Sequence, residues 1–476
     1  MFKDTRDVDE SVGTIQKLYP RIVALKPKIA EAAEAEDLET YKGITRIFAE
    51  AGEAWVVLIA RMPGEFLSLV EAVLECCARD WDRDSISLTF IFWYELKQYV
   101  TLEKYIEARL QFADIFSQLV DIMIKHLAFP TTSTDSTDPF EGDREQEEKF
   151  REFRHAMGDV LKDCCAVIGV TECLGKSFLL IQEWVKKYGS QATTTTVPHW
   201  QELEAPLFSM RAMGRMVSPE ESIVLPQVIP LIVQIPNQER IRFQAIMALG
   251  RYTEWTAQHP EFLQPQLNYI ISGFQHDSEE VLRAAALAFR FFGADCRKLL
   301  RDNAIQLHEF YESVIDNLPP ASQEELTEGV AAVLSVQPLD KVYEMFKLYC
   351  DPLIRRLMSL ADNAQADKEK LALAGMQSRY PLLSTSPELT CYFRLSTASD
   401  YLHPMDTALR LAFRREPCCK VLSRDISRPV CNRRKFHFLP RDSRTSVSML
   451  AAYGHLIPHS HGPYIAIVGE TTGLRV

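Results

Sequence analysis

Apolar residues recur with the spacing of a helix from about residue 7 to residue 374. Between residues 105 and 127 they stand three, four or seven positions apart, which places them on one face of a long helix. The set is Tyr105, Phe112, Phe116, Leu119, Met123 and Leu127. A β-prone run at residues 56–59 follows Ala- and Glu-rich residues that favour a helix. With no convincing period-two strand, the pattern predicts an all-α chain.

Small residues recur along these predicted helices. The sequence Ala-Met-Gly-Arg at residues 212–215 resembles Ala-Leu-Gly-Arg at residues 248–251, and Ala288 and Ala332 follow in the same register. Two helices in roughly 40 residues is the period of HEAT and armadillo repeats. The alternative is a non-repetitive helical bundle. The persistent register favours an α-solenoid of HEAT-type helix-turn-helix repeats over residues 1–374, in which neighbouring repeats bury each other's apolar faces.

A polar, acidic segment interrupts the helices at about residues 130–148. Its acids are close in sequence and mostly without a base to pair with, and they are Asp135, Asp138, Glu141, Asp143, Glu145, Glu147 and Glu148. Ionised carboxylates form strong, charge-assisted hydrogen bonds with Arg and Lys. We therefore take these residues as the candidate partner-binding site. The alternative is a solvated loop that only connects two helices.

The charge of the chain changes sign near residue 375. Residues 376–476 carry 14 Lys and Arg against 7 Asp and Glu, whereas residues 1–375 carry 39 against 58. The first part should repel nucleic acid and attract basic partners. Residues 375–476 lack a sustained helical pattern, which suggests a disordered basic tail or non-native sequence, such as a translated intron or a shifted reading frame. We favour the second interpretation; a natural or engineered basic tail is a further alternative.

Other kinds of chemistry have little support in the sequence. No run of 18 apolar residues occurs, so we expect no membrane span. A stretch from Gly169 to Ser177 resembles a phosphate-binding loop, but five residues instead of four separate its glycines, so we expect a helix–helix turn. His155 with Cys164 and Cys165 matches no zinc spacing. We expect no metal, no cofactor and no catalytic site, and we expect the cysteines to be reduced and mostly buried.

Three segments resemble one known family. They are Phe-Ile-Phe-Trp-Tyr-Glu-Leu at residues 90–96, Phe-Arg-Glu-Phe-Arg at 150–154 and Gly-Asp-Val-Leu-Lys-Asp at 158–163. Over residues 1 to about 373 the chain resembles the transportin-SR branch of the importin-β family of nuclear transport receptors. The resemblance implies an α-solenoid that carries Arg/Ser-rich RNA-binding proteins into the nucleus and releases them to Ran-GTP. It also implies contact with nuclear pore proteins and a location in both nucleus and cytoplasm.

Members of that family have repeats before and after the part that this chain resembles. Those repeats include an N-terminal Ran contact and a later Arg-rich helix used for phosphorylated cargo, and neither is recognisable in this sequence. We therefore expect the middle part of a nuclear import receptor, which binds cargo and Ran-GTP but no nucleic acid directly. The alternative function is a HEAT-repeat scaffold subunit of another protein complex.

Overall fold

A computed structural model describes residues 5–351, with gaps at 80–82, 132–138, 194–196, 339, 346 and 350. All described residues lie in one compact unit of the chain. Within them every regular element is a helix, and no strand occurs. The prediction of an all-α fold is therefore confirmed. The predictions for residues 375–476 lie outside the described residues.

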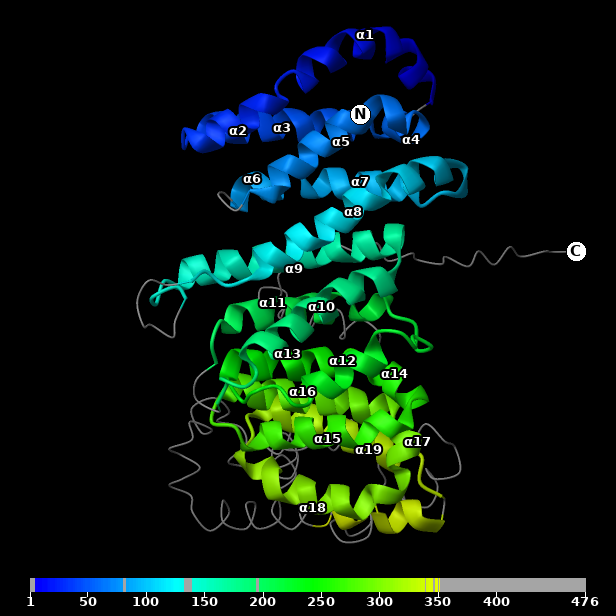
Figure 1. Cartoon of the computed structure of the whole chain (residues 1–476). Coiled ribbons are helices and arrows are strands. Elements are labelled where there is room, and N and C mark those ends of the chain that lie inside the picture. The colour runs from blue at the N-terminus through cyan, green and yellow to red at the C-terminus, as the bar shows by residue number, and fades with distance from the viewer. Residues whose placement is uncertain are drawn as a thin grey trace, which may run out of the picture. The chain divides into compact units, whose positions relative to one another are not determined.

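Successive helices run back and forth across the stack, roughly antiparallel to one another (Figure 1). The first ten are α1 (Thr5–Val23), α2 (Lys26–Glu34), α3 (Leu38–Ala54), α4 (Val56–Arg61), α5 (Pro63–Ala78), α6 (Arg83–Ser87), α7 (Phe90–Val100), α8 (Ile106–Leu127), α9 (Arg144–Ile168) and α10 (Val170–Tyr188). The next nine are α11 (Trp200–Met213), α12 (Leu225–Ile232), α13 (Glu239–Leu249), α14 (Thr253–Gln258), α15 (Leu263–Ser272), α16 (Glu279–Asp295), α17 (Arg297–Leu300), α18 (Ala304–Val314) and α19 (Pro320–Leu334).

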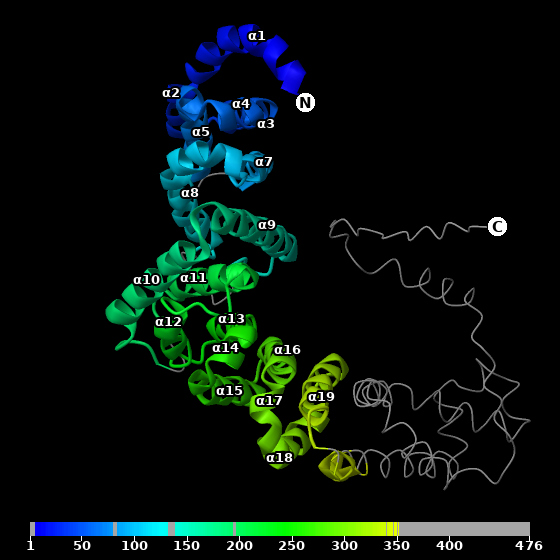
Figure 2. The same ribbon diagram turned by 90° about the vertical axis from the view of Figure 1, so that its right-hand side faces the viewer.

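Two columns of helices run through the stack (Figure 2). We call the helices α3, α7, α9, α11, α13, α16 and α19 the first column, and each of them packs on the next. The second column consists of α5, α8, α10, α12, α15 and α18 (Figure 2). Each repeat thus contributes one helix to each column, which is the arrangement of an α-solenoid. The predicted solenoid is confirmed for the described residues.

Helix boundaries follow from local capping chemistry. The side chain of Asp37 accepts a hydrogen bond from the backbone N–H of Thr40 at 3.0 Å and caps α3. Gly169 joins α9 to α10 with a φ of 96°, a left-handed conformation that glycine adopts without strain. The run at residues 56–59 lies in α4, as its helical flanks predicted.

The predicted stripes point into the core between the columns. On α8, Phe112, Phe116, Leu119, Met123 and Leu127 are fully buried, while Tyr105 is half-buried in the turn before the helix. Similar apolar stripes on α13 and α16 are buried as well, together with Tyr252 just after α13, and their members are Ile241, Ala245, Leu249, Val281, Ala285, Ala288 and Phe292. One contiguous core therefore runs through the described repeats.

Small residues mark where helices of the first column cross. A β-carbon added to Gly158 would lie 3.2 Å from the Cβ of Ala212, and one added to Gly250 would lie 3.1 Å from the Cα of Ala288. One added to Gly293 would lie only 2.3 Å from the carbonyl oxygen of Gly329. The register read from Ala212, Ala248, Ala288 and Ala332 therefore falls on consecutive helices of the first column, namely α11, α13, α16 and α19.

We expect Gly293→Ala to destabilise the chain by about 1–3 kcal/mol, because the new methyl group forces α16 and α19 apart. The matched control is Gly43→Ala, since Gly43 lies inside α3 with open space where a β-carbon would stand. That substitution should stabilise the chain by about 0.5–1 kcal/mol, because alanine loses less backbone entropy in a helix. Thermal melting of both variants checks this, and equal melting temperatures would contradict the close crossing.

Candidate partner-binding site

The predicted acidic loop is shorter than expected, because α9 begins at Arg144 and includes Glu145, Glu147 and Glu148. Of its seven acids, Asp135 and Asp138 lie outside the described residues, and the other five are exposed. Asp143 is the N-cap of α9, and its side chain accepts hydrogen bonds from the backbone N–H groups of Glu145 and Gln146, both at 3.1 Å. The structure thus places Glu141, Asp143, Glu145, Glu147 and Glu148 around one helix N-terminus, where negative charge is favourable.

A cluster of aromatic rings lies at the base of this segment. The rings of Phe129, Phe140 and Phe150 contact one another, with centroid distances of 5.2 to 6.2 Å. Trp200 joins them from α11, 5.3 Å from Phe129. Because Phe129 and Phe140 stand on either side of residues 132–138, the cluster ties both ends of that stretch to α9 and α11. The exposed acids therefore lie beside a packed cluster of aromatic rings.

The acids are paired with nearby bases more fully than the sequence suggested. Glu145 forms an ion pair with Lys149 at 2.7 Å, one helical turn further along α9. Glu148 forms another with Arg151, and this contact holds the pKa of the Glu148 carboxyl below its usual range. The expectation of mostly unpaired acids is wrong for these two, because helical spacing brings each within reach of a base. A basic partner would have to displace these local pairs.

A buried ion pair fixes α9 against α11 beneath this surface. Arg154 Nη2 donates to Glu204 Oε1 at 2.8 Å and to Oε2 at 2.6 Å, and both side chains are almost fully buried. The Arg154 guanidinium also lies over the ring of Phe208, 4.1 Å from its centroid. A second, less buried pair joins Lys97 of α7 to Asp163 of α9 at 2.9 Å. Both pairs involve residues in or beside the segments that carry the family resemblance.

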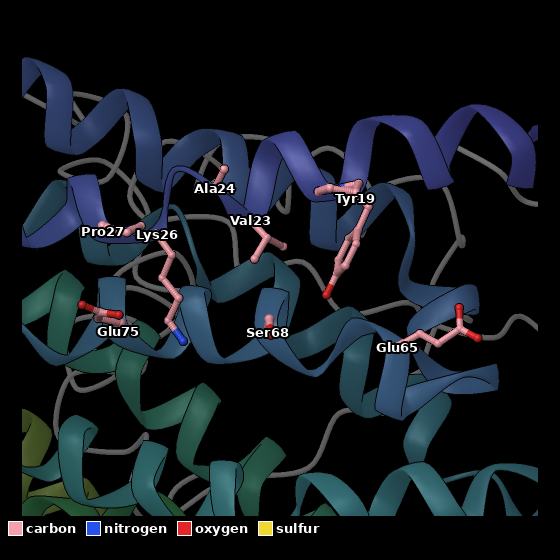
Figure 3. Close-up of a pocket in the computed structure, with 9 residues that line it drawn as sticks. Tyr19, Val23, Ala24, Lys26, Pro27, Glu65, Ser68 and Glu75 are labelled. Atoms are coloured by element: carbon pink, nitrogen blue, oxygen red, sulfur yellow. The ribbon is translucent and has the colours of Figure 1, made fainter.

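A pocket of about 780 Å³ lies between the α1–α2 turn and α5 (Figure 3). Tyr19 and Val23 face α5 from above, and Glu65 and Glu75 stand at opposite ends (Figure 3). The other side chains that line it are Pro20, Ala24, Lys26, Pro27 and Ser68.

The charge of this pocket is set by its carboxylates. Lys26, its one lining cation, forms an ion pair with Glu71 at 3.0 Å, which lies outside the lining. Tyr19 packs edge-to-face on Phe66, with ring centroids 4.9 Å apart, and burial raises the pKa of its hydroxyl. The pocket is therefore an apolar groove with a carboxylate at each end, and one of them, Glu75, forms an ion pair with Arg79 at 3.9 Å that a basic ligand would have to displace.

The sequence did not reveal this pocket. Its lining comes from α1, the turn after it and the start of α2, and from α5 about 50 residues later, and these residues share no motif. The only signal in the sequence was the excess of acids over bases in residues 1–375, which indicates basic partners without saying where they bind.

In the segment that resembles a phosphate-binding loop, Gly169 forms the predicted helix–helix turn, but residues 170–177 are already the first turns of α10. Lys176 forms an ion pair with Asp121 at 2.7 Å, and the Ser177 hydroxyl shares a hydrogen bond of 2.7 Å with Ser209. Within the described part of the chain, no group of three or more His, Cys, Asp or Glu could hold a metal ion. No helix among those described is both long and apolar enough to cross a membrane. The cysteines within the described ranges are buried and free.

Comparisons with known proteins agree with this architecture. Residues 36–126 match the family model of the Transportin-3/Importin-13 second TPR domain, and residues 222–309 match that of the third TPR domain. The solved structure of importin-13 in its cytosolic state superposes with a TM-score of 0.64 at 16% identity, covering 84% of this chain and 51% of that one. The structure of Kap121p bound to Pho4p gives a TM-score of 0.57 at 14% identity, covering 88% and 39%.

Sequence relatives extend over most of the described stack. An uncharacterized protein of Schizosaccharomyces pombe is 43% identical over 385 residues, which are 78% of this chain and 39% of that protein. The mRNA transport regulator MTR10 of Saccharomyces cerevisiae is 36% identical over 384 residues, covering 78% and 38%. Human importin-13 is 25% identical over 381 residues, covering 77% and 38%. The chain thus spans about two fifths of the length of these relatives.

The stacked helix pairs and the small-residue crossings define an α-solenoid of the karyopherin type, and structural neighbours share it. The family matches and the relatives go one step further. Over most of its length the chain is similar to proteins of the Transportin-3/Importin-13 and MTR10 type, which supports a place in the importin-β family.

We expect Glu204→Gln to destabilise the chain by about 3–5 kcal/mol, because it leaves the buried charge of Arg154 without a counter-charge. The double variant Arg154→Met with Glu204→Leu should be less destabilised than Glu204→Gln, since it removes both charges together. Lys162→Gln, which breaks an exposed pair with Asp159, is the control and should stay within about 0.5 kcal/mol of the wild type. Chemical denaturation measures all three. A double variant less stable than Glu204→Gln would contradict the claim that the unpaired charge of Arg154 causes the loss of stability.

Proposed function

We propose that the chain is the cargo- and Ran-binding middle part of a nuclear import receptor of the transportin-SR branch. The cargo would be Arg/Ser-rich or RNA-binding proteins, which shuttle with the receptor between cytoplasm and nucleus. The observation that supports this most is the alignment with the mRNA transport regulator MTR10, which runs over 78% of the chain at 36% identity. In this function the chain binds proteins and catalyses no reaction.

The charges of the surface support a basic cargo. The groove between α1 and α5 carries carboxylates at both ends, and the N-terminus of α9 displays five exposed acids. An Arg/Ser-rich segment is extended and positively charged, so it complements both surfaces. Contact with nuclear pore proteins is proposed by analogy, because a related karyopherin, Kap121p, has been solved bound to Nup53p.

Release by Ran-GTP would act through coupling between sites. If Ran-GTP favours one arrangement of the stacked repeats and cargo favours another, each weakens the binding of the other by the same factor. The alternative function, a HEAT-repeat scaffold of another complex, requires no response to the nucleotide on Ran.

Retention of the full chain on immobilised Ran distinguishes these functions. We expect Ran loaded with a non-hydrolysable GTP analogue to retain the chain about tenfold more than Ran-GDP, which is a difference of about 1.4 kcal/mol. Equal retention would favour the scaffold.

A labelled peptide of four Arg-Ser repeats tests the acidic segment in the same preparation. Glu145→Gln with Glu147→Gln should weaken its binding about threefold, as expected for exposed charge pairs. Glu220→Gln with Glu261→Gln, which removes two exposed acids elsewhere, should leave it unchanged. Equal effects of the two double variants would show that the acidic segment is not the binding surface.

A further inference from the structure

Three arginines meet at the crossing of α11 and α13. Arg211 lies in the last turns of α11, Arg215 follows that helix directly, and Arg251 follows α13. Gly214 allows this approach, since a β-carbon on it would lie 2.7 Å from the Cβ of Arg251. The side chain of Arg251 therefore passes directly over the backbone between Arg211 and Arg215. Two consecutive helices of the first column bring the three positive charges to one place.

These arginines have no acidic partner of their own. Among the described residues, none of Arg211, Arg215 and Arg251 forms an ion pair, whereas Arg154 on the neighbouring α9 is paired with Glu204. Arg211 Nη1 instead donates to the amide oxygen of Gln244 at 3.1 Å. Burial and the neighbouring charges of Arg251 and Arg154 lower the pKa of Arg211 to about 10, with Glu204 opposing them only weakly. Positive charges are thus held together against their mutual repulsion.

Aromatic rings lie beside two of the three guanidinium groups. Arg211 lies over the rings of Phe208 and Phe243, 5.9 and 5.7 Å from their centroids. Arg251 lies 5.8 Å from the ring of Phe291, on α16. Such cation–π contacts orient an arginine without neutralising its charge. Because Arg215 is exposed and Arg211 and Arg251 are half-buried, all three guanidinium groups remain within reach of solvent.

We propose that Arg211, Arg215 and Arg251, here called the arginine strip, bind a carboxylate-rich extended segment of a protein partner. Guanidinium groups in fixed orientation bind carboxylates through paired hydrogen bonds. Helices pack about 8–10 Å apart, so the strip and its contact with α16 extend over roughly 20 Å. About six extended residues, at about 3.3 Å each, would cover that length.

The surroundings favour a short acidic peptide over a nucleic acid. The Phe rings of the strip already have guanidiniums over them and offer bases little free face for stacking. Residues 1–375 carry 58 acids against 39 bases, so a longer polyanion would run from the strip onto an acidic surface. This surface is separate from the acidic segment and the α1–α5 groove, and the proposal does not depend on a basic cargo.

Fluorescence anisotropy with the full chain tests the strip. The probe is a fluorescein-labelled peptide with six consecutive Glu between Gly-Ser flanks, and the reference peptide has Gln in their place. We expect Arg215→Gln with Arg251→Gln to weaken binding of the Glu peptide about tenfold. The matched control, Arg46→Gln with Arg283→Gln, removes two exposed arginines, one from α3 and one near the start of α16. It should change the affinity less than about twofold.

Three further measurements make the test decisive. Arg215→Gln alone changes an exposed side chain and should fold normally, and it should weaken binding about threefold. Raising the salt from 50 to 300 mM should weaken the wild type more than the double variant, because screening acts on the charges that bind. No preference for the Glu peptide over the Gln peptide would overturn the proposal. Tighter strip-dependent binding of a 12-nucleotide oligouridylate would also overturn it, in favour of RNA.

Discussion

The close approach of consecutive helices in the first column is the constraint on which the rest of the structure depends. A single helix pair cannot bury its own apolar face, so each repeat is stable only against its neighbours. At Gly293 and Gly329 the backbones of α16 and α19 meet so closely that no side chain fits between them. The same crossings place Arg251 over Gly214 and bring separate repeats to a common surface. Packing in the column and the position of the proposed arginine strip therefore share one cause.

Charge is distributed over this scaffold in two distinct ways. Around the start of α9 and in the α1–α5 groove, carboxylates reach solvent, and three of them, Glu145, Glu148 and Glu75, already pair with a lysine or arginine. At the α11–α13 crossing, arginines are held by aromatic rings and an amide instead of by acids. Surface pairs of the first kind contribute little to stability and can be exchanged for a partner. The second arrangement keeps positively charged arginines close together, and an acidic ligand would reduce the repulsion between them.

Much of the fold follows from the sequence, and less of the candidate site does. The recurrence of Ala248 and Ala288 in one register along the predicted helices indicated the column helices, because each repeat must bury its apolar face against its neighbours. Individual acids were harder to interpret: Glu145 and Glu148 were expected to be unpaired, but the helix places a base three or four residues later beside each. The groove at Tyr19 was missed because packing of distant helices creates it. Proximity between repeats depends on their stacking angles, which no short motif encodes.

Hydrogen exchange measured by mass spectrometry on Gly293→Ala tests the dependence on neighbour contacts most directly. If the column crossings hold the stack together, the extra methyl group should lower protection in both α16 and α19. Protection in α3 and α7 should stay at the wild-type level, because each repeat contacts only its neighbours. Loss of protection in α16 and α19 with unchanged protection in the distant α3 and α7 is the result we predict. Unchanged protection in α19, or an equal loss in every helix, would contradict a stack stabilised repeat by repeat.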